Sequence, residues 1–170
     1  VVRTGLFLKN FEVFDVANDR FVFGAVVWFE FNTDQVMPEI LEKFSFINGK
    51  ILDRSPGDVR VNGTTMFTRY DVRVEAKSQL TYYRFPFDDH RFSLAITNDF
   101  VTPSEIFFTV DNSSFGMKPD LFSSASQIAE TGTAWGYADL LLDDNDGSKS
   151  VQRPVVVYSI NVYKSGIRGI

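Results

Sequence analysis

The sequence has no cysteine and only one histidine, His90, among its 170 residues. Disulfide bridges, thiolate metal sites and cysteine nucleophiles are therefore excluded, and so is a metal site built from several histidines. Lys and Arg form no run and the net charge is −5, which argues against a nucleic-acid partner. No apolar stretch approaches the roughly 20 residues that a membrane-spanning helix needs.

Aromatic residues, in contrast, are abundant. Hydrophobic residues make up 44% of the chain and aromatic residues 15%, with 18 Phe. Such side chains fit the half-buried surface of a β-sheet. A length of 170 residues suits one domain with its own core. The composition therefore favours a single all-β domain over residues 1–170.

Alternation of apolar and polar residues marks the two longest predicted strands. In residues 21–32 one parity is wholly apolar and the other is mixed: Phe21, Phe23, Ala25, Val27, Phe29 and Phe31 against Val22, Gly24, Val26, Trp28, Glu30 and Asn32. In residues 64–77 one parity is largely apolar and the other is charged from Arg69 onward: Met66, Tyr70, Val72, Val74 and Ala76 against Arg69, Asp71, Arg73, Glu75 and Lys77. Period-two alternation of this kind predicts strands with one buried and one wet face.

Turn signals and a parity slip divide the rest of the chain. Asn62-Gly63 suits a two-residue hairpin turn, since both residue types tolerate positive φ. A slip near Asn10 predicts a bulge in a first strand over residues 5–16, and only residues 37–44 are a candidate for a short helix. Residues 111–133 lack clear alternation and are interpreted as a mobile connection. About ten strands without βαβ spacing predict an immunoglobulin-like β-sandwich of two antiparallel sheets.

The most informative stretch runs from Tyr83 to Leu94 and contains Phe85-Pro86-Phe87-Asp88. It resembles the signature loop of pentameric ligand-gated ion channels, the Cys-loop receptor superfamily, in the cysteine-free form of prokaryotic members. Further segments resemble that family in the same order along the chain: Gly5–Leu8, Phe21–Phe31, Phe44–Asn48, Thr133–Trp135 and Tyr158–Lys164. The resemblance implies an extracellular ligand-binding domain whose loop at Phe85, Pro86, Phe87 and Asp88 couples ligand binding to the membrane domain.

The resemblance also implies a ligand site between subunits, lined by aromatic residues from several loops. The positions it assigns are Phe46, Asn48, Asp99, Phe100 and Arg153, together with Trp28 and Phe31 from the neighbouring subunit. Aromatic rings attract cations, so an amine is one candidate ligand, whereas arginines such as Arg69, Arg73 and Arg153 suit an acid. Phe31 shares parity with the apolar face of its strand and is equally a candidate for the core.

Other chemistry finds little support in the sequence. Asp143, Asp144 and Asp146 form an oxygen-rich stretch and a weak calcium candidate, but their spacing does not match an EF-hand loop and a solvated hairpin is the default interpretation. His90 is accompanied by no Gly-x-Ser-x-Gly elbow. We therefore expect neither an enzyme nor a cofactor.

These observations lead to three hypotheses. The first is the ligand-sensing extracytoplasmic domain of a prokaryotic pentameric ligand-gated channel, which binds a small molecule between subunits, forms a pentamer in the full-length protein and joins the membrane through a segment outside this chain. The second is a non-channel extracytoplasmic sensor or binding module of a bacterial signalling protein with the same fold. The third is a carbohydrate-binding or hydrolytic sandwich, for which no defensible carboxylate pair is found.

Overall fold

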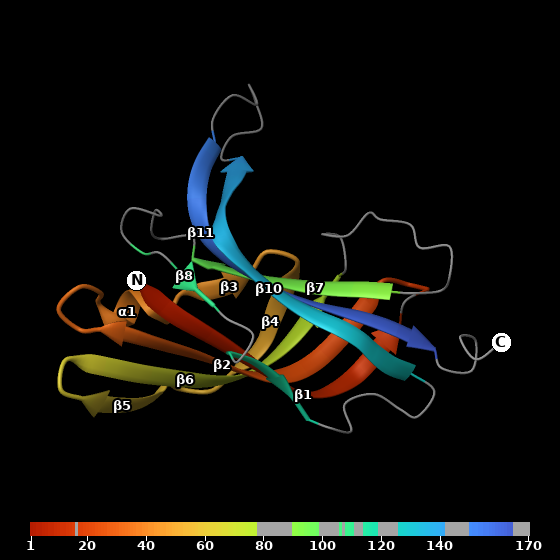
Figure 1. Ribbon diagram of the computed structural model, residues 1–170, viewed down its shortest axis with the longest axis horizontal. Coiled ribbons are helices and arrows are strands. Elements are labelled where there is room, and N and C mark those ends of the chain that lie inside the picture. The colour runs from red at the N-terminus through yellow and green to blue at the C-terminus, as the bar shows by residue number, and fades with distance from the viewer. Residues whose placement is uncertain are drawn as a thin grey trace.

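Strands β1 (Val2–Asp15) and β2 (Arg20–Asn32) open the computed structural model as an antiparallel pair (Figure 1). The structure describes residues 1–15, 17–77, 90–98, 106, 108–110, 114–118, 126–141 and 150–164. The other described elements are α1 (Pro38–Leu41), β3 (Phe44–Phe46), β4 (Gly49–Arg54), β5 (Asp58–Asn62), β6 (Thr65–Ala76), β7 (His90–Asn98), β8 (Phe108–Thr109), β9 (Phe115–Met117), β10 (Ser126–Leu141) and β11 (Ser150–Lys164).

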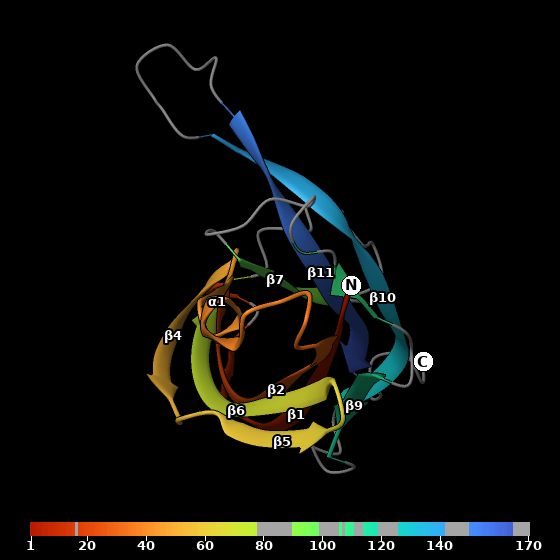
Figure 2. The same cartoon turned by 90° about the vertical axis from the view of Figure 1, so that its left-hand side faces the viewer.

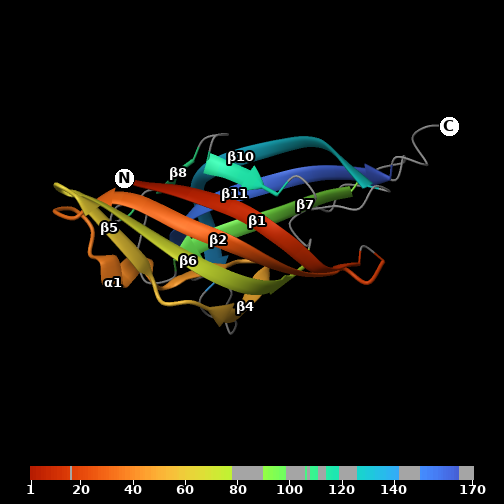
Figure 3. The same cartoon turned by 90° about the horizontal axis from the view of Figure 1, so that it is seen from below.

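The strands form two sheets, which confirms the predicted all-β sandwich. A seven-stranded sheet has the order β4-β6-β2-β1-β8, with β5 also paired to β6 and β9 also paired to β1. A four-stranded sheet has the order β10-β11-β7-β3. Figures 2 and 3 show the two sheets facing each other. One difference from purely antiparallel sheets is found at β1, where the short strands β8 and β9 pair in parallel.

The bulge in β1 agrees with the sequence analysis, and the turn between β5 and β6 differs from it by one residue. The register between β1 and β2 shifts at Leu8/Asn10 and again at Phe11/Val13, which confirms the predicted bulge near Asn10. The hairpin between β5 and β6 turns at Gly63, whose φ is +63°. Asn62 pairs with Thr65, so the two-residue turn consists of Gly63 and Thr64 and lies one residue later than predicted.

The short helix expected within residues 37–44 is found, whereas the connection expected over residues 111–133 differs from its prediction. The helix expected within residues 37–44 is a single turn, because Pro38 starts it and the chain returns to a strand at Phe44. The connection expected over residues 111–133 contains β9 and the first half of β10. This part of β10 includes Thr131-Gly132-Thr133-Ala134, which has no large apolar residue. The sequence therefore shows no alternation of apolar and polar residues there.

The core lies between the two sheets and is dominated by phenylalanine. Phe21 and Phe92, from opposite sheets, pack with ring centroids 4.7 Å apart, and Phe29 stacks on Phe108 at 6.0 Å. The apolar parity of β2 and that of β6 both face this core, and their other parities face outward. Because the core uses only one face of β2 and β6, Trp28 and its polar neighbours are displayed on the outer face of the seven-stranded sheet.

Candidate ligand-binding site

Trp28 is held in place on the outer face of the sheet by the strand beside it. Its partner across the β1–β2 ladder is Gly5. The indole ring occupies the space in which a side chain on Gly5 would lie. An aromatic ring that covers a cross-strand glycine packs on backbone that would otherwise be exposed, and this fixes the direction of the ring along the sheet.

The indole ring has two close neighbours. Phe67 of β6 stacks with it at a centroid distance of 5.4 Å and an interplanar angle of 28°. The guanidinium carbon of Arg3 lies 5.1 Å from the centre of the Trp28 ring, and Arg3 also forms a 3.8 Å ion pair with Glu30. A cation over an indole face contributes about 0.5–1 kcal/mol at an exposed site. The cation-binding position on Trp28 is therefore already filled by the protein.

A shallow groove of about 410 Å³ opens beside this aromatic pair. We call it the Trp28 groove. Its lining divides into apolar side chains, which we call the floor, and charged side chains of β5 and β6, which we call the rim: Phe7, Val26, Trp28 and Phe67 form the floor, and Asp58, Arg60 and Arg69 form the rim. Phe7 is 37% exposed, which is high for a phenylalanine on a sheet.

The hairpin of β5 and β6 sets the charge of the rim. Arg60 is the ladder partner of Phe67, and Asp58 is the ladder partner of Arg69, so all four side chains share the outer face. Within the described part of the chain, neither Arg60 nor Arg69 takes part in a hydrogen bond or an ion pair. Two exposed guanidinium groups with no protein partner among the described residues thus border the apolar floor.

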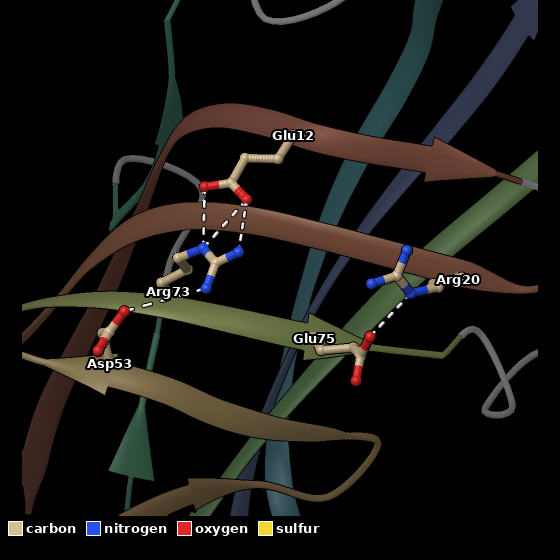
Figure 4. Close-up of polar contacts among 5 residues, drawn as sticks. All are labelled: Glu12, Arg20, Asp53, Arg73 and Glu75. Atoms are coloured by element: carbon tan, nitrogen blue, oxygen red, sulfur yellow. Dashed lines mark hydrogen bonds and ion pairs between the residues drawn. The ribbon is translucent and has the colours of Figure 1, made fainter.

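The neighbouring part of the same face is different, because its charges neutralise one another (Figure 4). Arg73 holds Glu12 through both carboxylate oxygens, with a shortest contact of 2.8 Å, and lies 3.9 Å from Asp53. Arg20 pairs with Glu75 at 2.8 Å. The hydrogen bonds from Arg73 lower the pKa of the Glu12 carboxyl, and Glu12 in turn raises the pKa of Arg73. Arg20 and Arg73 are therefore used to pair with carboxylates of the same chain, whereas Arg60 and Arg69 of the groove are not.

The described residues that the sequence analysis assigned to the ligand site lie in different places. Trp28 lies in the groove, whereas Phe31 and Phe46 lie in the core and are 3% and 4% exposed. Asn48 is buried, and its amide bonds the carbonyls of Lys77 and Ser93 and accepts from the Ala95 amide. Arg153 is half-buried on β11. The structure therefore does not bring Trp28 together with Phe31 or Phe46, and packing accounts for both phenylalanines.

The remaining predicted positions lie outside the described residues. They are Asp99 and Phe100, the coupling loop at Phe85, Pro86, Phe87 and Asp88, and the calcium candidates Asp143, Asp144 and Asp146. In the described part of the chain, no group of three or more His, Asp or Glu residues is placed to hold a metal ion.

Sequence reasoning missed most of the groove. Phe67 shares its parity with Arg69 on β6, so an aromatic residue on a wet face was the signal that pointed to it. Arg60 joins the groove only through the register set by the Gly63 turn. Once Asn62 is paired with Thr65, counting outward along the ladder places Arg60 beside Phe67.

A second exposed aromatic surface lies on β10. Trp135 and Tyr137 are 48% and 60% exposed, yet their ladder partners Val156 and Pro154 are buried. The exposure of the two aromatics follows from the shape of the β10–β11 hairpin, which extends beyond the rest of the sandwich in Figures 1 and 2. The face of the four-stranded sheet that covers the core thus continues along β10 to positions exposed to solvent.

Comparisons with known proteins add no family to this description. No protein-family model matches the chain, and no curated protein shows significant sequence similarity to it. Across the residues that the structure describes, none of the helices has the length and apolarity needed to span a bilayer.

Proposed function

We propose that this chain is the ligand-sensing extracytoplasmic domain of a prokaryotic pentameric ligand-gated ion channel, and that a small molecule binds in the Trp28 groove. The observation that carries the proposal is the stacked pair of Trp28 and Phe67 on the solvent face of two central strands. An aromatic pair in that position adds little to the core, which lies on the opposite face of the sheet. It is therefore best explained as a surface for a ligand.

The dimensions and rigidity of the groove support this proposal. Pockets for small organic molecules usually measure about 300–1,000 Å³ and combine an apolar lining with a few polar groups. The Trp28 groove has both properties. Its side chains project from β1, β2, β5 and β6, which are joined by continuous ladders, and sites on strands hold their geometry better than sites on loops.

The arrangement of the strands also supports the proposal. Trp28 is one of the positions at which the resemblance implies contact with ligand from the neighbouring subunit. Arg153, another position that it implies, lies on β11, which with β10 forms the hairpin that extends beyond the sandwich. A projecting hairpin on one side and an open groove on another suit a ligand site completed by a second subunit.

The proposal is tested by the fluorescence of Trp28. The chain has two tryptophans, so Trp135→Phe leaves Trp28 as the only one. We expect a screen of amines, amino acids and carboxylates to find compounds that shift or quench the emission of this variant. The reverse variant, Trp28→Phe, retains Trp135 and is expected to lose the response. A response that follows Trp135 instead would place the ligand elsewhere, and silence in both variants would contradict a ligand-sensing role.

Channel function is tested separately from ligand binding. Native mass spectrometry of the full-length protein with saturating ligand is expected to show a pentamer. A full-length protein that binds ligand through Trp28 but remains a monomer at every concentration would favour the alternative, a non-channel sensor with the same fold.

A further inference from the structure

We infer that the Trp28 groove selects an aromatic monocarboxylate: a planar ring that lies on the apolar floor beside Trp28 and one carboxylate held by Arg60 and Arg69. This inference deepens the proposed function, on which it rests, by naming the class of ligand. It differs from the amine that an aromatic surface alone would suggest.

The first argument concerns the cation that already occupies Trp28. An amine ligand would bind through the face of an aromatic ring. Arg3 lies over the Trp28 ring at 5.1 Å, and Phe67 stacks beside it at 5.4 Å. An incoming ammonium would therefore have to displace the Arg3 guanidinium from the Trp28 ring.

The second argument concerns the arginines of the rim. Arg60 and Arg69 both point to the outer face and flank Phe67, since Arg60 is its ladder partner and Arg69 follows it by two residues on β6. Their guanidinium groups have no hydrogen bond or ion pair with any described residue, whereas Arg3, Arg20 and Arg73 on the same face each have a carboxylate partner. A guanidinium binds a carboxylate through two parallel hydrogen bonds, so the free pair on the rim matches this group.

The third argument concerns Asp58, which limits the charge of the ligand. Asp58 lies on the same rim as the two arginines but forms no ion pair within 4.0 Å with either of them among the described residues. The rim therefore carries two positive charges and one negative charge. A ligand with one carboxylate balances this set, whereas the second charge of a dicarboxylate would face Asp58.

The experiment titrates the Trp135→Phe variant with compounds matched in shape and different in charge. The compounds are phenylacetate, its neutral amide, phenethylamine and a phenyl dicarboxylate. We expect phenylacetate to bind at least tenfold more tightly than each of the others, because a charge-assisted hydrogen bond that is lost corresponds to about tenfold or more in affinity. The preference for the acid is expected to weaken as salt is raised.

Substitutions of the two arginines test whether they create the preference for the acid. Arg60→Gln and Arg69→Gln are each expected to reduce the affinity for phenylacetate about tenfold and to leave that for the amide unchanged. Arg73→Gln is the matched control, since it removes an exposed arginine of the same strand face that is already paired with Glu12. Thermal melts of all three variants verify that the fold is retained.

The outcomes separate this inference from the proposed function. If the amide or the amine binds as tightly as the acid through Trp28, the ligand class is wrong and the groove remains a binding site. If Arg60→Gln and Arg69→Gln leave the acid preference intact, the rim does not create it and the inference also fails. If no compound changes the emission of Trp28, both the inference and the proposed function are contradicted.

Discussion

Trp28 and Gly5 are ladder partners on adjacent strands, and the indole ring fills the place that a side chain on Gly5 would take. Each residue therefore depends on the other. The ring lies flat along the sheet only because Gly5 has no Cβ, and this orientation is what allows Trp28 to stack on Phe67 and form the floor of the groove.

Gly5→Ala is accordingly expected to displace the Trp28 ring. Overpacking of this kind costs about 1–3 kcal/mol, and here part of that cost is avoided when the half-exposed ring turns toward solvent. We expect a red shift of Trp28 emission in the Trp135→Phe background and loss of ligand binding, with a small fall in Tm. Gly136→Ala is the control, because nothing lies within 4 Å of a Cβ at that position. An unchanged emission spectrum would show that Gly5 does not determine the orientation of the Trp28 ring.

Asn48 is predicted to be a structural residue. Its side chain bonds the Lys77 carbonyl at 2.7 Å, the Ser93 carbonyl at 2.6 Å and the Ala95 amide at 3.3 Å, and so links the end of β6 to β7. Asn48→Ala leaves buried backbone groups without partners and should lower the free energy of unfolding by about 2–4 kcal/mol.

Urea denaturation measures this loss. Asn18→Ala provides the comparison, since among the described residues Asn18 bonds Asp15 alone, in an exposed turn, and its removal should have a much smaller effect. An Asn48 variant as stable as the native chain would refute a structural role and return the residue to the candidates for ligand contact.

Tyr158 is buried at 1% exposure, and its hydroxyl has no hydrogen-bond partner among the described residues. Burial raises the pKa of this phenol well above its ordinary value. Tyr158→Phe removes an unsatisfied polar group and is expected to leave the stability unchanged or to increase it by up to about 1 kcal/mol at neutral pH.

The same substitution carries a pH signature. A group whose pKa is raised on folding contributes fully to stability below its unfolded pKa, about 10 for tyrosine, and its contribution is lost as the pH rises above that value. The native chain should therefore lose stability relative to Tyr158→Phe above about pH 10, as followed by thermal melts. Parallel pH profiles for the two proteins would contradict this prediction.

Glu12 and Arg73 make a pH prediction of the opposite sign. Because the hydrogen bonds from Arg73 lower the pKa of Glu12, this pair stabilises the fold above the unfolded pKa of about 4.3, and the effect disappears as the pH falls through the lower folded value. Arg73→Gln should return the Glu12 pKa toward its ordinary value in an NMR titration of the carboxyl carbon. The two side chains are exposed, so we expect only a small difference in Tm, which should vanish once the pH falls below the lowered folded pKa of Glu12.

The fold follows from the sequence because its main signals are periodic. Alternation over residues 21–32 and 64–77 identified which face of each strand is buried, and the structure confirms that Phe21, Val27 and Val74 lie in the core. The parity slip near Asn10 similarly predicted a bulge, since one extra residue reverses the alternation.

The groove could not be predicted in the same way, because it depends on register between strands. Arg3, Trp28, Arg60 and Phe67 come from four strands, and only the ladders β1–β2, β2–β6 and β5–β6 place them side by side. The assignments of Phe31 and Phe46 came from the family resemblance. In this structure the apolar parity of each strand gives both residues a place in the core.

The order of the strands along the chain has a consequence for biosynthesis. Residues 2–76 supply β1, β2, β4, β5 and β6, whereas β7, β10 and β11 of the covering sheet are translated later. Five strands can therefore pair while Phe21, Phe23 and Phe29 still lack the layer that shields them from water. A nascent chain in this state resembles an aggregation-prone intermediate, so a product truncated after Lys77 should accumulate as insoluble protein and not as half of a domain.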